Sequence, residues 1–124
     1  MLKVENLTGG YQHLKILKDV SFEVHDGEVV GLIGLNGAGK STTIKHILGL
    51  LQPISGQIVL NDQNLQTNLT RYRQQIAFVP ETPILYPELT LKEHLALTMM
   101  AYQLDSQLAW QNANRLLKLF RLDQ

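Results

Sequence analysis

The chain has 124 residues, of which 44% are hydrophobic and 18% charged, a balance typical of a globular domain with a buried core. It contains no cysteine, which excludes disulfides, catalytic thiolates and cysteine-ligated zinc. Eleven basic and eleven acidic side chains cancel, and this balance disfavours a nucleic-acid-binding face, where a basic excess is usual. Residues 1–5 lack the apolar region expected of a secretory signal, and the longest apolar stretch is far short of the roughly 20 residues that cross a bilayer. We therefore expect a soluble, cytoplasmic protein that can still dock on a membrane partner.

The first half of the chain is rich in predicted strands. Alternating apolar and polar residues predict strands over residues 2–7 and 16–24, with a turn at residues 8–10 between them. An Asp-Gly turn follows, and the apolar run 28–33 then predicts a buried strand. Further along, the sequence predicts several short elements: strands at 57–60 and 76–79, a turn at 61–62, and helices at 40–50 and 69–75.

The last third of the chain predicts a pair of helices. Three of the four prolines fall within residues 80–89, so this segment is expected to form an ordered, non-helical loop from Pro80 to Leu89. Thr90 and Glu93 match a capping box and begin a helix that runs to about residue 103. Asp105 or Ser106 caps a second helix to about residue 121, with an apolar stripe at Ala109, Ala113, Leu116, Leu117 and Phe120. We place a subdomain boundary near residue 88, which gives domains 1–88 and 89–124.

Residues 34–41 match the phosphate-binding pattern G-x-x-x-x-G-K-[ST] at every fixed position. Gly34, Gly37 and Gly39 allow the backbone to turn its N–H groups inward, and the following helix points its positive dipole end at the same place. Lys40 supplies a mobile charge for the β- and γ-phosphates, and the Ser41 hydroxyl can bind Mg²⁺. A chance glycine-rich turn is the alternative, but the match lies between a predicted strand and a predicted helix, as such a loop requires.

The wider sequence resembles the ATP-binding cassette (ABC) ATPases. Residues 35–42, LNGAGKST, resemble the Walker A loop of that family. Further segments agree with it, at 17–22, 26–28, 49–58, 76–81 and 89–95, so the chain looks like the N-terminal half of an ABC transporter ATP-binding subunit. The string 79–86, VPETPILY, is similar to the Ecs-type bacterial exporter subgroup. The resemblance implies an α/β fold, in which a P-loop NTPase core carries an antiparallel β subdomain and the start of a helical subdomain, as in a truncated ABC ATPase.

The resemblance also implies roles for individual residues. Tyr11 takes the place of an aromatic side chain that stacks on adenine, and the alternative is a tyrosine that covers a sheet edge. Lys40 and Glu81 would act in catalysis, and Ser41 and Glu81 would contact Mg²⁺. Together with Tyr11, the residues that would bind ATP are Gly34, Asn36, Gly37, Ala38, Gly39, Lys40, Ser41 and Thr42.

Glu81 departs from the family, which normally has glutamine at this position. A carboxylate keeps an oxygen for Mg²⁺ but adds negative charge beside the γ-phosphate, which like-charge repulsion disfavours. We expect an altered nucleotide affinity or a gating role, and the alternative is an ordinary glutamate of a surface loop.

Several family features are missing from the sequence. It has no Leu-Ser-Gly-Gly-type signature and no run of four apolar residues that ends in Asp-Glu, and none of its histidines, at 13, 25, 46 and 94, takes the place of the family's switch histidine. Each histidine is expected to be a surface or half-buried one. We expect a fragment that binds nucleotide weakly, hydrolyses it negligibly and self-associates through exposed apolar surface.

In the full-length protein the resemblance implies ATP hydrolysis coupled to transport. The partners would be a second ATP-binding subunit and a transmembrane permease subunit, contacted through the loop from Pro80 to Leu89, at the inner face of the membrane. Two other functions remain open. One is an ABC-type ATPase of a soluble translation or DNA-repair system, and the other is a non-catalytic nucleotide-binding or assembly module that uses Leu116, Leu117 and Phe120 as an interface.

Overall fold

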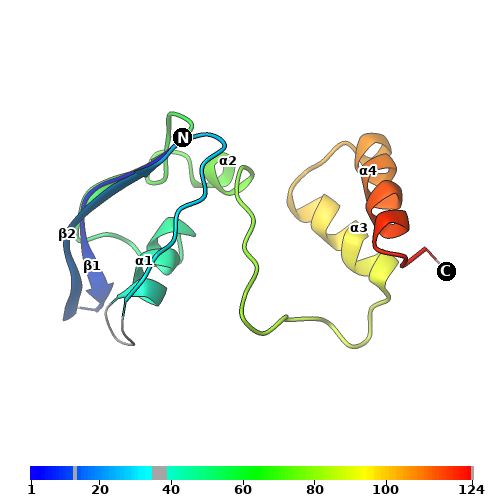
Figure 1. The fold of residues 1–124 in the computed structure, drawn as a ribbon, viewed down its shortest axis with the longest axis horizontal. Coiled ribbons are helices and arrows are strands. Elements are labelled where there is room, and N and C mark those ends of the chain that lie inside the picture. The colour runs from blue at the N-terminus through cyan, green and yellow to red at the C-terminus, as the bar shows by residue number, and fades with distance from the viewer. Residues whose placement is uncertain (13, 35–38, 124) are drawn as a thin grey trace. The chain divides into compact units, whose positions relative to one another are not determined.

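A computed structural model describes residues 1–12, 14–34 and 39–123 of the chain. It contains two compact units, Met1–Phe78 and Val79–Gln124 (Figure 1). The first unit holds the strands and two helices, and the second holds a pair of helices. The units divide between residues 78 and 79, whereas the sequence places a subdomain boundary near residue 88. In the described part of the chain, no helix has the length and apolar character that crossing a bilayer requires.

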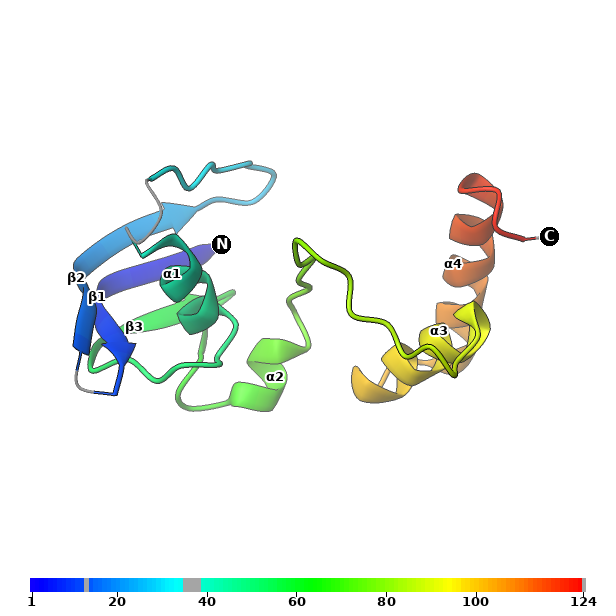
Figure 2. The same ribbon diagram turned by 90° about the horizontal axis from the view of Figure 1, so that it is seen from below.

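The first unit is built on an antiparallel sheet with the strand order β2-β1-β3-β4 (Figures 1 and 2). The strands are β1 (Leu2–Tyr11), β2 (Leu14–Val24), β3 (Ser55–Leu60) and the short β4 (Gln63–Asn64). β1 pairs with β2 along its whole length, from Leu2 opposite Val24 to Tyr11 opposite Leu14, and with β3 on its other side. The strands predicted over 2–7, 16–24 and 57–60 are therefore confirmed.

The turn predicted at residues 8–10 is wrong, because these residues continue β1. Gly9 pairs with Leu17 and Gly10 with Lys15. The two glycines allow close approach instead of a turn. A Cβ atom on Gly10 would lie 1.9 Å from the Leu14 carbonyl oxygen, and one on Gly9 would lie 2.3 Å from Nε2 of His46.

The core of this unit lies between the sheet and its two helices, α1 (Lys40–Ile47) and α2 (Leu69–Arg73). α1 lies against one face of the sheet (Figures 1 and 2). The helix predicted over 69–75 is confirmed as α2, and its N-terminus is capped by the side chain of Asn68. The buried cluster combines side chains of the sheet with those of the segment that leads into α2 and of α2 itself: Val4, Leu7, Leu17, Ile58, Leu65 and Tyr72.

Two predicted strands do not form. Residues 28–33 and 76–79 have no strand pairing in the described chain, and they are largely exposed. Val29, Ile33 and Val79 keep 98%, 95% and 90% of their surface accessible. A strand is stabilised by backbone hydrogen bonds to a neighbour and by burial of its side chains. No described strand gives these two segments backbone hydrogen bonds or buries their side chains. Their apolar composition alone therefore does not make them part of a sheet.

The second unit contains α3 (Leu91–Ala101) and α4 (Ser106–Leu119). Thr90 and Glu93 form the predicted capping box, and the Asp105 carboxylate accepts a 2.9 Å hydrogen bond from the Leu108 N–H at the start of α4. Residues 80–89 form no helix, as predicted. His94 of α3 holds the end of this loop, because its Nε2 atom accepts a 3.0 Å hydrogen bond from the Tyr86 N–H.

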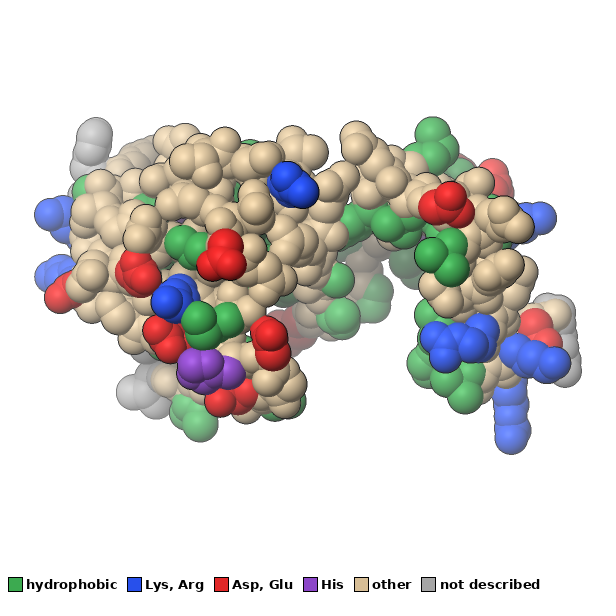
Figure 3. All heavy atoms as spheres, turned by 90° about the horizontal axis from the view of Figure 1, so that it is seen from above, with side chains coloured by type: hydrophobic (Ala, Val, Ile, Leu, Met, Phe, Trp, Pro, Cys, Tyr) green, Lys and Arg blue, Asp and Glu red, His purple; other side chains and the backbone are tan. Residues whose placement is uncertain are grey.

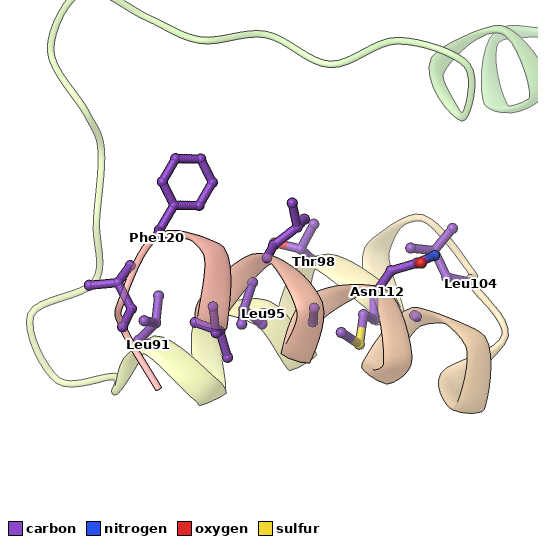
Figure 4. A pocket seen from close by; sticks show the side chains of 12 residues that line it. Leu91, Leu95, Thr98, Leu104, Asn112 and Phe120 are labelled. Atoms are coloured by element: carbon purple, nitrogen blue, oxygen red, sulfur yellow. The ribbon is translucent and has the colours of Figure 1, made fainter. Parts of the chain in front are cut away.

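An apolar groove of about 370 Å³ runs along the helix pair (Figure 4). The stripe predicted on the second helix forms part of its wall, and α3 contributes Leu91, Leu95 and Met99. Phe120, at the end of α4, is 67% exposed at the margin of the groove. The groove shows that this pair buries only part of its apolar surface within its own unit.

Candidate functional site

Helix α1 begins at a glycine in a conformation that other residues avoid. Gly39 has a φ of 95°, in the left-handed region, and a Cβ atom there would lie 2.6 Å from Cδ2 of Leu17 in β2. The chain therefore enters the helix in close contact with the sheet. Asn36, Gly37 and Ala38 lie outside the described residues, so their assignment to phosphate binding stays a prediction.

The N-terminus of α1 differs from those of the other described helices. Side chains of Asn68, Thr90 and Asp105 cap α2, α3 and α4, whereas no side chain among the described residues caps α1. The first N–H groups of a helix have no acceptor within the helix, and they carry the positive end of its dipole. This end of α1 therefore offers uncompensated donors to an anion.

Lys40, the first residue of α1, contacts Gly34. Its Nζ atom donates a hydrogen bond to the carbonyl oxygen of Gly34, so one side chain joins the two ends of the glycine-rich segment. The acceptor is neutral, and neither ion pair recorded among the described residues includes Lys40. Its positive charge is therefore not neutralised by a carboxylate. Ser41 follows and is exposed, while Thr42 is buried.

Hydrogen bonds within α1 hold its first turns. The Thr43 hydroxyl and N–H both donate to the Gly39 carbonyl oxygen, over 2.7 and 2.8 Å. His46 is fully buried, and its Nδ1 atom lies 2.8 Å from the Thr42 carbonyl oxygen. Because a carbonyl only accepts, Nδ1 carries the proton, and the buried Nε2 atom is left without a partner beside Gly9. The expectation of a surface or half-buried histidine is therefore wrong for His46.

The other end of α1 is fixed by a glycine turn and by α2. Gly49, with a φ of 79°, donates to the His46 carbonyl, and the Leu50 N–H donates to the Lys45 carbonyl, which together form a Schellman turn. This turn ends the helix three residues earlier than residue 50, where the sequence predicts its end. Tyr72 of α2 donates a 2.6 Å hydrogen bond to the Ile47 carbonyl, and burial raises the pKa of its phenol to about 12. The C-terminal end of α1 is therefore held in place by α2 and by the turn at Gly49.

Tyr11 lies beside α1 although it comes from the end of β1. Its hydroxyl accepts a 2.8 Å hydrogen bond from Nζ of Lys45, and 40% of its surface remains accessible. The ammonium group of Lys45 lowers the pKa of the Tyr11 phenol. Of the predicted ATP site, Gly34 thus contacts the first residue of α1 through Lys40, and Tyr11 contacts the last turn of the same helix through Lys45.

Comparison with known proteins identifies the family. A model of the ABC transporter family matches residues 17–124, which is most of the chain. The chain belongs to the ABC transporter family. The ABC-type transporter ATP-binding protein EcsA of Bacillus subtilis is 51% identical over 124 residues, which cover all of this chain and 50% of EcsA. The ABC transporter ATP-binding protein YthP of the same organism is 45% identical over 88% of this chain and 42% of its own length.

A solved ATP-binding subunit of an ABC transporter has the same fold. It superposes with a TM-score of 0.90 and is 52% identical, over 98% of this chain and 51% of that subunit. The α/β fold expected from the ABC resemblance, with its antiparallel sheet, is thereby confirmed. The chain spans about half the length of these ABC relatives.

Glu81, which replaces the glutamine usual in ABC ATPases, belongs to the second unit. It is exposed, and its assignment to metal binding and catalysis stays a prediction. The described residues include no group of three histidine and acidic side chains that could hold a metal ion.

Sequence reasoning missed Thr43, Lys45 and His46, whose side chains make contacts within α1 or beside it. Thr43 and His46 each bond to the carbonyl four residues earlier, a spacing that is readable from a predicted helix. Lys45 gives no such signal, because its partner Tyr11 is distant in sequence and is brought close only by the fold.

Proposed function

We propose that the chain binds MgATP at the N-terminus of α1. The observation that carries this proposal is that α1 alone, among the described helices, begins without a side-chain cap and with a lysine whose charge is not paired with a carboxylate. A triphosphate supplies the negative charge and the acceptors that this helix end lacks. Lys40 would contact the β- and γ-phosphates, Ser41 would bind Mg²⁺, and Tyr11 would stack on adenine.

For the whole protein we propose an ATP-binding subunit of a membrane transporter. EcsA and YthP, both ABC transporter ATP-binding proteins, support this role over the alternatives in translation, DNA repair or assembly. Two such subunits would enclose ATP, and in-line attack by water would depend on positioning and charge neutralisation. The loop from Pro80 to Leu89 would contact a transmembrane permease subunit at the cytoplasmic face of the membrane. Exposed apolar side chains of that loop, such as Ile84 and Leu85, fit a protein partner.

Charge on the molecule agrees with a protein partner more than with a nucleic acid. The net formal charge is zero, and acidic and basic side chains are interspersed on the view of the Met1–Phe78 unit in Figure 3. A basic stripe, as proteins that bind nucleic acid phosphates carry, is not seen on that face.

Calorimetric titration with MgATP tests the proposed binding. Lys40→Ala is expected to weaken MgATP binding by about 10- to 100-fold, because a charge-assisted hydrogen bond to phosphate is lost. Lys118→Ala, which removes an exposed lysine of α4, serves as the matched control and is expected to leave the affinity unchanged. An affinity that Lys40→Ala does not alter would refute the phosphate assignment. Turnover by these 124 residues is not expected, since the sequence holds no Leu-Ser-Gly-Gly signature and no acidic pair after an apolar run.

A further inference from the structure

Lys45 makes a contact that the proposed phosphate site does not use. Its Nζ atom lies 2.8 Å from the Tyr11 hydroxyl and 5.2 Å from the centre of the Tyr11 ring. The hydroxyl is much the nearer group, so the contact is chiefly a hydrogen bond from the ammonium to the phenol oxygen. Neither ion pair recorded among the described residues includes Lys45. The tyrosine is therefore its partner, and no carboxylate in the described part of the chain forms an ion pair with the ammonium group.

The helix places Lys45 in register with the phosphate site. Ser41 and Lys45 are four residues apart and thus lie on one face of α1, and both are exposed. The helix that carries Lys40 and Ser41 toward a triphosphate therefore also carries the group that holds Tyr11. Because α1 is anchored through Tyr72 and Gly49, this geometry is set by a rigid element.

A fixed ring binds a flat base better than a free one. Immobilising a side chain when a ligand binds costs conformational entropy, and an anchor that orders it beforehand removes part of that cost. The hydroxyl is the only polar group of a tyrosine ring, so a hydrogen bond at this point restrains the ring from its edge. Tyr11 remains 40% exposed, which leaves area for stacking.

We propose that Lys45 is a positioning residue that orients the Tyr11 ring for stacking on a nucleotide base. The inference rests on the proposed nucleotide-binding function. In this proposal Lys45 contributes to recognition of the base through Tyr11. This contribution differs from the electrostatic attraction between the Lys45 ammonium and the phosphates.

Binding of two ligands, MgATP and magnesium tripolyphosphate, separates base stacking from charge attraction. Tripolyphosphate has the phosphates without the base. Removing the charge of Lys45 weakens both through long-range attraction, whereas loss of base stacking weakens MgATP alone. For Lys45→Met we expect the ratio of the two affinities to fall by about 3- to 10-fold, the loss that one hydrogen bond accounts for. Tyr11→Phe keeps the ring but removes the acceptor, and should lower the ratio similarly. The double variant should lose no more than either single variant, and Lys118→Met should change nothing.

A second measurement needs no nucleotide. NMR can follow the pKa of the Tyr11 phenol, with Tyr11→Phe used to assign its signal. This pKa should rise in Lys45→Met and stay low in Lys45→Arg. Lys45→Arg should also keep the ratio of the MgATP and tripolyphosphate affinities at the wild-type value. An equal loss for both ligands in Lys45→Met, or a phenol pKa that does not change, overturns the inference and leaves the proposed function standing. A wild-type chain that binds neither ligand refutes the proposed function, and the inference with it.

Discussion

Two apolar segments of the first unit have contrasting structures. β1 (Leu2–Tyr11) is paired on both sides and buries Val4 and Leu7 almost completely. Residues 28–33 have at least as apolar a sequence, yet they pair with no described strand and leave Val29 and Ile33 almost fully exposed. The difference lies in the neighbours available, because β1 has β2 and β3 beside it and α1 against its face.

The contrast shows how the candidate site is held. α1 receives its support from the sheet through Gly9 and Gly39, and from α2 through Tyr72 and Arg73. The segment before the glycine-rich loop gives no pairing that fixes its position. The described contacts thus anchor the site through α1, whereas residues 28–33, which precede the loop, make no strand pairing in the described chain.

The largest expected effect comes from removing the link between α2 and α1. Tyr72 is fully buried, so Tyr72→Ala should lower the free energy of unfolding of the first unit by about 3–5 kcal/mol, through a cavity and a lost hydrogen bond. Tyr72→Phe keeps the packing and should cost only about 1 kcal/mol. Urea unfolding followed by circular dichroism measures both. A cost below 1 kcal/mol for Tyr72→Ala would show that α2 does not support α1.

A matched pair of valines tests the contrast directly. Val4 is 1% exposed and Val29 is 98% exposed. Val4→Ala should destabilise the first unit by about 2 kcal/mol, while Val29→Ala should stay within about 0.5 kcal/mol of the wild type. The same urea titration gives both values. Equal costs for the two substitutions would mean that residues 28–33 are buried in solution and that the contrast is wrong.

Local signals in the sequence predicted much of this fold. Alternation located three strands of the sheet, and capping residues located the starts of α3 and α4 at Thr90 and Asp105. The glycine-rich pattern predicted that α1 begins at Lys40. Each of these features depends on residues that are close in sequence. Their local conformational preferences are therefore enough to predict it, without knowledge of contacts between distant residues.

Features that depend on distant residues were not predictable in this way. The apolar runs 28–33 and 76–79 predicted strands because periodicity cannot reveal whether a neighbouring strand is present. Likewise, the burial of His46 depends on Gly9, and the position of Tyr11 depends on Lys45. In the candidate site, the pattern identified the helix start and its lysine, but the side chains that support them come from elsewhere in the fold.

The last and smallest prediction contrasts two tyrosines, one buried behind α1 and one exposed beside it. Burial raises the pKa of Tyr72 from 10.0 to about 12, whereas Lys45 lowers the pKa of Tyr11. Since the unfolded chain releases the Tyr72 proton near pH 10, the stability that this group contributes is present below pH 10 and is lost as the pH rises toward 12. The loss should not exceed about 1.4 kcal/mol per pH unit. Tyr72→Phe should remove this part of the slope from unfolding curves measured between pH 10 and 12, the range between the unfolded and folded pKa of Tyr72. In a spectroscopic titration of the folded chain, Tyr11 should ionise before Tyr72, and the reverse order would place Tyr72 at the surface.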